Sequence, residues 1–393
     1  MTKSINWVIE LKISILGAGH GGYAMYADLS MTGHEVNLYE LPEFAENIKP
    51  IIDKGGIDVI ARRPPNEEFQ LPAGGQTGFA KITGRITSDV KEALDDVDLI
   101  MLVVPAFARE RFIKEIAPYL RDGQVLVIWP AYFGALQCVE NLKKMNVNRD
   151  IVVAETESLI YACRKIGPAQ VLVEDFKRKL LISAFPAEKT AEVLNLMKEI
   201  YPQLVSARNV LETTLSNINP ILHPASILVN LYRVEAKFYP FYEEIGGPFC
   251  RCYDITPGIA RVMEAIDRER LNIAKQLGMK LLSLKETLTA FYSAYGRNLY
   301  ETILNVPAYQ KQLAPTSLEH RFIVEDVPYG LVPYSQLGNH INVQTPTTNA
   351  LIRIASVVCD RNFWSESRVL DEIGLTNMTA EEILEYVTRG STS

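Results

Sequence analysis

Cysteine is scarce in this sequence and shows no pairing pattern. The 393 residues contain five cysteines, at positions 138, 163, 250, 252 and 359, and no C-x-x-C spacing occurs among them. An odd set of unpaired cysteines favours neither a disulfide framework nor a zinc site. We therefore expect reduced thiols, a cytoplasmic location and no metal site.

Long hydrophobic runs and clusters of basic charge are also missing. The longest apolar stretch, Leu99 to Ala108, is interrupted by Pro105 and falls short of the roughly 20 residues that a membrane span needs. Glu10 and Lys12 interrupt the apolar N-terminal residues, so no secretory signal is expected. The 40 Lys and Arg residues are scattered among 47 Asp and Glu residues, giving a net charge of −7. We expect neither nucleic acid nor a membrane as a partner.

The motifs G-x-S-x-G and H-E-x-x-H are absent, which argues against a serine hydrolase and a zinc protease. The composition, with 48% hydrophobic and 22% charged residues, is that of an ordinary folded protein. From Lys12 to Ala207, short apolar runs alternate with amphipathic stretches, which predicts a doubly wound α/β domain. Its predicted strands are Lys12–Leu16, Glu35–Tyr39, Leu99–Val104, Gln124–Ile128, Ile151–Ala154 and Lys179–Ala184.

The second half of the sequence has few β-branched runs and contains long segments with helical periodicity. Gly258 to Leu277 and Leu281 to Leu299 are two such predicted helices. A chain of this length favours two domains. We predict an α/β domain over residues 11–208 and a mostly α-helical domain over residues 209–393.

A glycine-rich turn follows the first predicted strand. The run Gly17-Ala18-Gly19-His-Gly-Gly22 matches G-x-G-x-x-G between that strand and a predicted helix reaching about Thr32. Gly17 permits a tight turn, Gly19 lets a pyrophosphate approach the backbone, and Gly22 allows close helix packing. The fingerprint predicts a Rossmann-type domain that binds a dinucleotide; the alternative is an ordinary glycine-rich turn.

An acidic residue stands where the dinucleotide fingerprint requires one. Glu40 follows the second predicted strand, 23 residues beyond Gly17, and is placed to accept hydrogen bonds from the adenosine ribose. The same carboxylate would repel a 2′-phosphate, so NAD is favoured over NADP. NADP stays an alternative, because Lys49 or Arg62 would offset this repulsion if it lay nearby.

Two further connections are candidate walls of the cofactor site. Val104 and Pro105 end the third predicted strand, and Ile128-Trp129-Pro130 ends the fourth. Because the carboxyl ends of strands line the ligand crevice of a doubly wound sheet, both are predicted to lie on the nicotinamide side. Both are equally compatible with simple loop starts.

A histidine lies in an apolar segment that carries two prolines. His223 stands between Pro220 and Pro224, within the segment from Thr213 to Asn230. Proline removes a backbone donor and clashes with the preceding turn, so we expect the helix to kink or restart near His223. A histidine at such a break is either a general acid and base or a core residue.

A second polar segment runs from Glu319 to Pro333. Its two prolines and its glycine favour a loop or an extended segment over a helix. Arg321 is suited to bind a carboxylate, and Asp326 is suited to orient an imidazole. The alternative is a surface ion pair.

Taken together, these motifs resemble the opine dehydrogenase family, which includes octopine and nopaline dehydrogenases. The resemblance covers nearly the whole chain and is carried by the glycine turn, Ile86-Thr-Ser-Asp89 with Asp98 to Pro105, Glu155-Thr-Glu-Ser158, Asn219-Pro-Ile-Leu-His223-Pro224, and Arg321 to Pro333. It implies that His223 is catalytic, that Asp326 pairs with it, and that Arg321 binds a substrate carboxylate. Asn219 is a further candidate for substrate binding. The stretch from Trp129 to Gly134 departs from the family, because it is bulkier than the expected small-residue turn.

The resemblance implies NAD(P)H-dependent reductive condensation of a 2-oxo acid, commonly pyruvate, with the amino group of an amino acid. It also implies a reaction cleft between the two domains and, by analogy, a homodimer. Two rival functions stay open. One is a 2-hydroxyacid or sugar-phosphate dehydrogenase with the same two-domain layout, and the other is a dinucleotide-sensing protein without catalysis.

Overall fold

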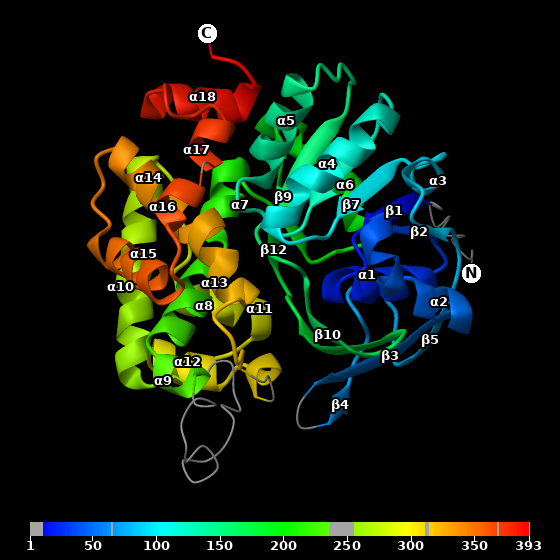
Figure 1. Ribbon diagram of the computed structural model, residues 1–393, viewed down its shortest axis with the longest axis horizontal. Coiled ribbons are helices and arrows are strands. Elements are labelled where there is room, and N and C mark those ends of the chain that lie inside the picture. The colour runs from blue at the N-terminus through cyan, green and yellow to red at the C-terminus, as the bar shows by residue number, and fades with distance from the viewer. Residues whose placement is uncertain (1–10, 64–65, 236–254, 311–313, 368, 393) are drawn as a thin grey trace, which may run out of the picture.

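The computed structural model describes residues 11–392 except 64–65, 236–254, 311–313 and 368, so Cys250 and Cys252 lie outside the described residues. Figure 1 shows strands gathered in one half of the molecule and helices in the other. This arrangement confirms the predicted fold class, a Rossmann-type α/β part followed by a mostly helical part. Every helix of the described residues is too short or too polar to cross a bilayer.

The larger sheet carries the predicted strands side by side. Its order is β13-β12-β9-β8-β7-β1-β2-β6, and neighbours run parallel except β9 and β12. The ends of each predicted strand differ from the observed ones by two residues at most. The strands are β1 (Lys12–Leu16), β2 (Glu35–Tyr39), β6 (Ile86–Thr87), β7 (Leu99–Leu102), β8 (Val125–Ile128), β9 (Val152–Thr156), β12 (Leu180–Phe185) and β13 (Leu204–Ser206).

A smaller sheet was not predicted. It runs in the order β10-β11-β3-β4, with β5 paired to β3. Helix α1 (His20–Met31) packs against strands of both sheets, and Figure 1 shows it between β1 and the pair β10 and β3. Residues 21–30 of α1 are all buried as a result. The strands are β3 (Gly56–Arg63), β4 (Glu67–Glu68), β5 (Gly78–Lys81), β10 (Tyr161–Gly167) and β11 (Gln170–Phe176).

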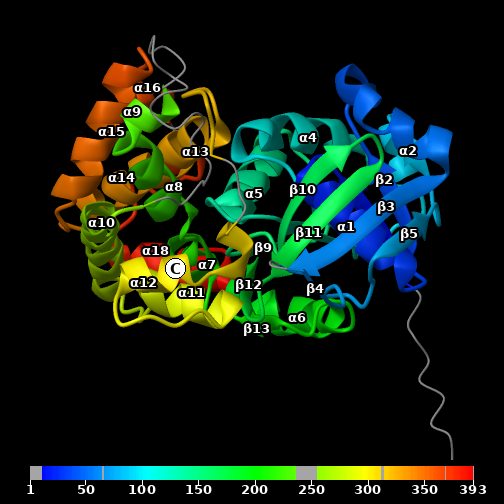
Figure 2. The same ribbon diagram turned by 90° about the horizontal axis from the view of Figure 1, so that it is seen from below.

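Short helices connect the strands of the α/β half. Figure 2 shows α4 on one side of the larger sheet and α6 on the other. Helix α4 packs against α5, and α6 packs against β12 and β13. The helices are α2 (Lys49–Lys54), α3 (Val90–Ala93), α4 (Arg109–Ile116), α5 (Gly134–Lys144) and α6 (Thr190–Lys198).

The rest of the chain is a cluster of helices (Figure 1). The predicted helix over Gly258–Leu277 is α10. The predicted helix over Leu281–Leu299 is wrong as a single element, because Ser293 takes a φ of +54° and the Asn298 side chain caps a new helix. The helices are α7 (Val210–Ser216), α8 (Asn219–Leu228), α9 (Leu231–Val234), α10 (Pro257–Gln276), α11 (Leu284–Tyr292), α12 (Leu299–Leu304), α13 (Arg321–Val324), α14 (Val332–His340), α15 (Pro346–Val358), α16 (Phe363–Glu366), α17 (Val369–Glu372) and α18 (Ala380–Arg389).

The last helices return to the α/β half. Helix α17 packs against α5, and α18 packs against β12. The rings of Phe185 and Tyr386 lie 5.0 Å apart, and the Tyr386 hydroxyl donates to Glu140 Oε1 at 2.9 Å. The boundary predicted after residue 208 lies between β13 and α7, and the chain crosses back near its C-terminal end.

A buried carboxylate in α1 connects the helix to the elements around it. Asp28 is fully buried and accepts hydrogen bonds from Ala73 N at 2.9 Å, Gly75 N at 2.7 Å and the Tyr161 hydroxyl at 2.9 Å. Burial raises the pKa of Asp28 to about 6, since the loss of hydration outweighs these three donors. The carboxylate thereby joins α1 to the loop before β5 and to β10.

Replacing this carboxylate by an amide should destabilise the fold. In Asp28→Asn, one of the two oxygens becomes an NH2 group, so either Ala73 N or Gly75 N faces a donor and loses its acceptor. We expect a loss of about 1–3 kcal/mol in the free energy of unfolding, measured by urea denaturation. Asp53→Asn, on the exposed side of α2, is the control and should change the stability by less than about 0.5 kcal/mol. Equal stabilities of the two variants would contradict the role of Asp28.

Candidate active site

The turn between β1 and α1 requires glycine at two positions. Gly17 has a φ of +104°, and a Cβ there would lie 2.8 Å from the Val103 carbonyl oxygen. A Cβ on Gly22 would lie 1.8 Å from the Gly17 carbonyl oxygen. Gly19 is exposed, and apart from Gly19 itself and its two chain neighbours no described atom lies within 4 Å of the place of its Cβ. This open space at the N-terminus of α1 fits the approach of a pyrophosphate.

Glu40 lies beside this turn. Its Oε2 accepts a hydrogen bond from Ala18 N at 3.0 Å, and its Oε1 accepts one from Leu41 N at 3.0 Å. Only 6% of the residue is exposed, and burial raises the pKa of its carboxyl group above the usual range. The structure thus brings the glycine turn and the acid together, and the ribose contact stays a prediction.

A cation lies beside the turn, but it is neither Lys49 nor Arg62. Lys49 and Arg62 are held in ion pairs at 2.7 and 3.3 Å by acids of their own segments. Lys165, from β10, instead places its Nζ 3.4 Å from the Ala18 carbonyl oxygen and 4.2 Å from the centre of the Tyr23 ring. Its charge acts on the nearby Glu40 carboxylate. A cation therefore stands beside the acid, on a strand of the sheet that the sequence did not reveal.

The two connections after β7 and β8 lie in different surroundings. Val104 and Pro105 follow β7, and Val104 packs on the glycine turn, with its Cγ1 2.4 Å from the place of a Cβ on Gly17. The connection after β8 contains Tyr132, whose hydroxyl donates to Asp326 Oδ1. The first connection thus borders the dinucleotide turn, and the second meets the helical half.

A histidine and a carboxylate 103 residues apart form a buried pair. His223, in α8, places its Nδ1 2.8 Å from Asp326 Oδ2, and the two residues are 4% and 0% exposed. The Phe322 ring stacks on the imidazole at 3.6 Å. Burial lowers the pKa of His223, although Asp326 acts in the opposite direction. With Nδ1–H donated to the carboxylate, the tautomer that carries its lone pair on Nε2 is favoured.

Local structure around this pair differs from the prediction. The segment from Glu319 to Pro333 is helical, as α13, a π-helical turn η7 (Val327–Leu331) and the start of α14. Its prolines, Pro328 and Pro333, stand at the starts of helical units, where a missing N–H costs nothing. The break expected at His223 lies earlier, since α7 ends at Ser216 and α8 begins at Asn219, with Pro224 inside it.

Arg321 pairs with the acid next to Asp326. Its Nε lies 3.6 Å from Glu325 Oε2, and 44% of the arginine side chain is exposed against 1% of the glutamate. Glu325 Oε1 also accepts a hydrogen bond from Ala106 N, just after β7, at 2.8 Å. Burial raises the pKa of Glu325. Asn219 begins α8 one turn before His223 and is half-buried, and its contact with substrate stays a prediction.

A buried lysine near the pair was missed. Lys177 is 7% exposed, and its Nζ donates to the Leu159 carbonyl oxygen at 2.5 Å. Burial lowers the pKa of Lys177 to about 8, and its charge contributes to the low pKa of His223. No sequence spacing marks Lys177, whereas the acidic dipeptide before Val327 was a visible signal for Glu325.

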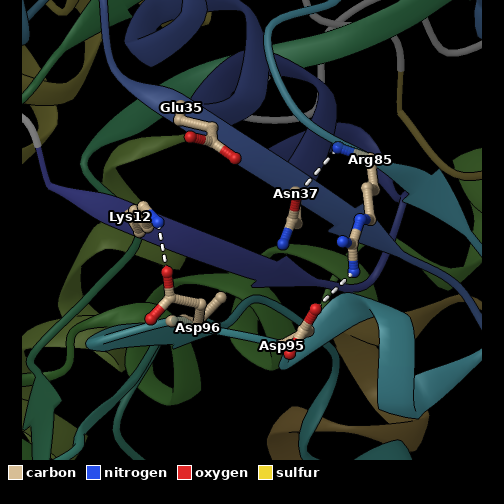
Figure 3. A pocket seen from close by; sticks show the side chains of 7 residues that line it. Lys12, Glu35, Asn37, Arg85, Asp95 and Asp96 are labelled. Carbon is tan, nitrogen blue, oxygen red and sulfur yellow. Dashed lines mark hydrogen bonds and ion pairs between the residues drawn. The ribbon is translucent and has the colours of Figure 1, made fainter.

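A polar pocket lies at the opposite end of the larger sheet. Its volume is about 140 Å³, and it is found beside the first residues of β1 and β2. Figure 3 shows both of its cations already paired, Lys12 with Asp96 and Arg85 with Asp95. The pocket is therefore separate from the candidate site, which lies at the carboxyl ends of the strands.

Comparisons with known proteins agree with both halves of the structure. Residues 12–131 match the family model "NAD-dependent glycerol-3-phosphate dehydrogenase N-terminus", and residues 206–359 match "NAD/NADP octopine/nopaline dehydrogenase, alpha-helical domain". The opine dehydrogenase of Arthrobacter sp. (strain 1C) is 33% identical over 97% of this chain and its own full length. Protein ocs of Agrobacterium tumefaciens (strain Ach5) is 26% identical over 95% of this chain and 98% of its own.

A solved structure of octopine dehydrogenase in complex with NADH and agmatine has the same fold. The TM-score is 0.74 at 21% identity, over 98% of this chain and 99% of that one. Fold and comparisons define the class of the protein as NAD(P)-dependent oxidoreductases with a nucleotide-binding half and a helical half. Within this class, the chain belongs to the opine dehydrogenase family.

The charge of Glu40 should set the preference between the two dinucleotides. In Glu40→Gln, an oxygen remains to accept from Ala18 N, but the negative charge beside the ribose is removed. NADH binding should weaken about tenfold, and NADPH binding should tighten. Fluorescence titration with each cofactor measures both constants.

The exposed neighbour Glu43 provides the matched control for this experiment. Glu43→Gln removes the same charge close in sequence but away from Ala18, so both affinities should stay at the wild-type values. An unchanged ratio of NADH to NADPH affinity in Glu40→Gln would show that Glu40 does not contact the ribose.

Proposed function

We propose that this protein uses NADH to reduce the imine formed between a 2-oxo acid, with pyruvate as the first candidate, and the amino group of an amino acid. The observation that carries the proposal is the buried pair of His223 and Asp326 facing the nucleotide-binding half. Support comes from the Arthrobacter relative, an opine dehydrogenase that aligns over its full length. A dinucleotide sensor would have no use for such a pair.

The cofactor would be held at the carboxyl ends of β1, β2 and β7. NADH supplies the hydride, and NADPH is the alternative because Lys165 lies beside Glu40. The open face of Gly19 fits a pyrophosphate, and Glu40 is placed for the ribose hydroxyls. The residues proposed to hold the dinucleotide are Gly17, Ala18, Gly19, Gly22, Glu40, Val104 and Pro105.

His223 would move the protons of the condensation. Its Nε2 accepts a proton from the amino group as the nitrogen bonds to the carbonyl carbon of the 2-oxo acid. The same nitrogen returns that proton to the carbonyl oxygen, which becomes a hydroxyl group. A second proton, relayed in the same way from the amino nitrogen to this hydroxyl, lets it leave as water and gives the imine. Asp326 holds Nδ1–H throughout, so the ring keeps one orientation and its protonated form is stabilised.

Arg321 would anchor a substrate carboxylate. Its side chain is 44% exposed, so the guanidinium can contact a ligand while its Nε stays paired with Glu325. Asn219, one turn before His223 on α8, is proposed as a neutral partner for the same substrate. Burial of the His223 pair in the helical half would limit the access of water, which hydrolyses imines.

Larger features of the protein complete the proposal. We place the domain boundary at residue 208, with the dinucleotide on residues 11–208 and substrate groups on residues 209–393. By analogy with relatives, we propose a homodimer and a cytoplasmic location. Analytical ultracentrifugation tests the oligomeric state, and a monomer at assay concentration would remove the dimer from the proposal.

Substrate dependence distinguishes this function from its rivals. NADH oxidation is followed with pyruvate alone, with each amino acid alone, and with pyruvate together with each amino acid. Consumption should require both organic substrates. Oxidation with a 2-oxo acid alone would identify a 2-hydroxyacid dehydrogenase, and binding of NADH without any turnover would identify a sensor.

His223→Ala should abolish turnover while leaving the dinucleotide site intact. General acid–base catalysis contributes roughly 100-fold or more, so kcat should fall by at least that factor. The Kd for NADH should stay within about twofold of wild type, since the glycine turn is untouched. His340→Ala, on the exposed end of α14, is the control. Full activity in His223→Ala would remove this residue from the mechanism.

A further inference from the structure

Asp326 has a second partner besides His223, and it comes from the other half of the molecule. Tyr132 follows β8, is 2% exposed, and donates its hydroxyl hydrogen to Asp326 Oδ1. His223 Nδ1 is bonded to the other oxygen, Oδ2, at 2.8 Å. Burial and the charge of Asp326 raise the pKa of Tyr132 well above its usual value. The phenol therefore stays protonated and acts as the donor.

The loop that carries this tyrosine is held from several sides. Tyr132 has a φ of +54°, a conformation that a bulky side chain rarely adopts without support. The fully buried Arg109 donates to the carbonyl oxygens of Pro130 and Tyr132, and its guanidinium lies 5.7 Å from the tyrosine ring. Phe133 N donates to Thr214 Oγ1, in α7, at 2.8 Å. These contacts fix the phenol at Asp326.

Close packing within the helical half also brings Asp326 near Tyr132. A Cβ on Gly330, in η7, would lie 2.4 Å from Pro220 of α8 and 3.5 Å from the Tyr132 ring. Glycine at this position thus lets η7 approach α8, which carries His223, and brings Asp326 within reach of the phenol. The Tyr132, Asp326 and His223 side chains form one chain of hydrogen bonds across the two halves.

We propose that Tyr132 is a positioning residue for the acid–base pair: it fixes both the orientation and the hydrogen-bonding strength of the Asp326 carboxylate that holds His223. This inference rests on the proposed function, in which His223 moves protons. A carboxylate that accepts from two donors shares its negative charge between them and attracts an imidazolium less strongly. Tyr132 would thereby keep His223 able to release its proton as well as to accept one.

This sharing of charge predicts the direction in which the pKa of His223 changes when the phenol is removed. Without the phenol, Asp326 would interact more strongly with protonated His223, so the pKa of His223 should rise. Tyr132→Phe keeps the ring and removes one hydroxyl group, and it leaves every charge around the pair in place. The charged and titratable groups that face the pair are Arg321 of α13, Glu325 just after it, His320 before it, Lys177 after β11, and Tyr334 of α14.

The test measures the protonation of His223 directly and without turnover. In substrate-free protein, the His223 ring signal is followed by NMR against pH and assigned by its loss in His223→Ala. The pKa of His223 should be about one unit higher in Tyr132→Phe than in wild type. In the assay with both organic substrates, kcat should fall about tenfold, with the KM for the 2-oxo acid within about twofold of wild type.

Tyr201→Phe is the matched control, because its buried hydroxyl bonds to the Tyr161 hydroxyl at 2.9 Å, away from Asp326. It should leave the pKa of His223 and kcat unchanged. An unshifted pKa of His223 in folded Tyr132→Phe would overturn the inference. If wild type shows no turnover that needs both organic substrates, the proposed function fails instead, and the NMR result still stands by itself.

A measurement on the unaltered protein covers the case in which Tyr132→Phe does not fold. The phenolic proton of Tyr132, bonded to a carboxylate, should give a signal downfield of the amide protons. It is assigned through the labelled tyrosine ring. Its chemical shift should change over the same pH range in which the His223 imidazole titrates. A chemical shift that does not change when His223 is protonated would refute the coupling.

Discussion

The adjacent carboxylates of Glu325 and Asp326 join the two halves of the molecule. Glu325 accepts from Ala106 N, after β7, and Asp326 accepts from the Tyr132 hydroxyl, after β8. Because β7 and β8 are neighbours in the sheet, one turn of the helical half meets two neighbouring strand ends. Both acids are buried, and the α/β half supplies each of them with a hydrogen-bond donor that a buried polar group needs. The position of His223 relative to the glycine turn therefore depends on this contact.

Local constraints explain which parts of the fold could be predicted from the sequence. The glycine turn and the apolar strands were found because a tight turn and a strand covered on both faces each restrict which residue types can stand at neighbouring positions. The smaller sheet was missed because β3 and β10 mix charged with apolar residues, as exposed strands do. Helix α1 did carry a signal of the smaller sheet. It has no polar face although it is not a membrane segment, which indicates a helix covered on all sides.

The site was less accessible to prediction than the fold. The prolines at 328 and 333 were interpreted as helix breakers, although proline also starts helices, so the segment around Asp326 was predicted as a loop. The pairing of His223 with Asp326 was proposed through family resemblance, because no spacing relates residues 103 positions apart. Tyr132 and Lys177 lie in connections that follow β8 and β11. The sequence alone does not tell where these connections lie relative to His223, because that depends on the order of the strands in the folded sheets. The net charge of −7 likewise gave no hint of cations gathered around His223.

The C-terminal helices provide a second connection between the two halves. After building the helical half, the chain passes through α17 and lays α18 on β12, where Tyr386 contacts Phe185 and Glu140. Two separate peptide crossings thus span the boundary, one near α7 and one near α17. The helical half is therefore covalently connected to the α/β half near both of its ends, which limits how far the two halves can rotate against each other.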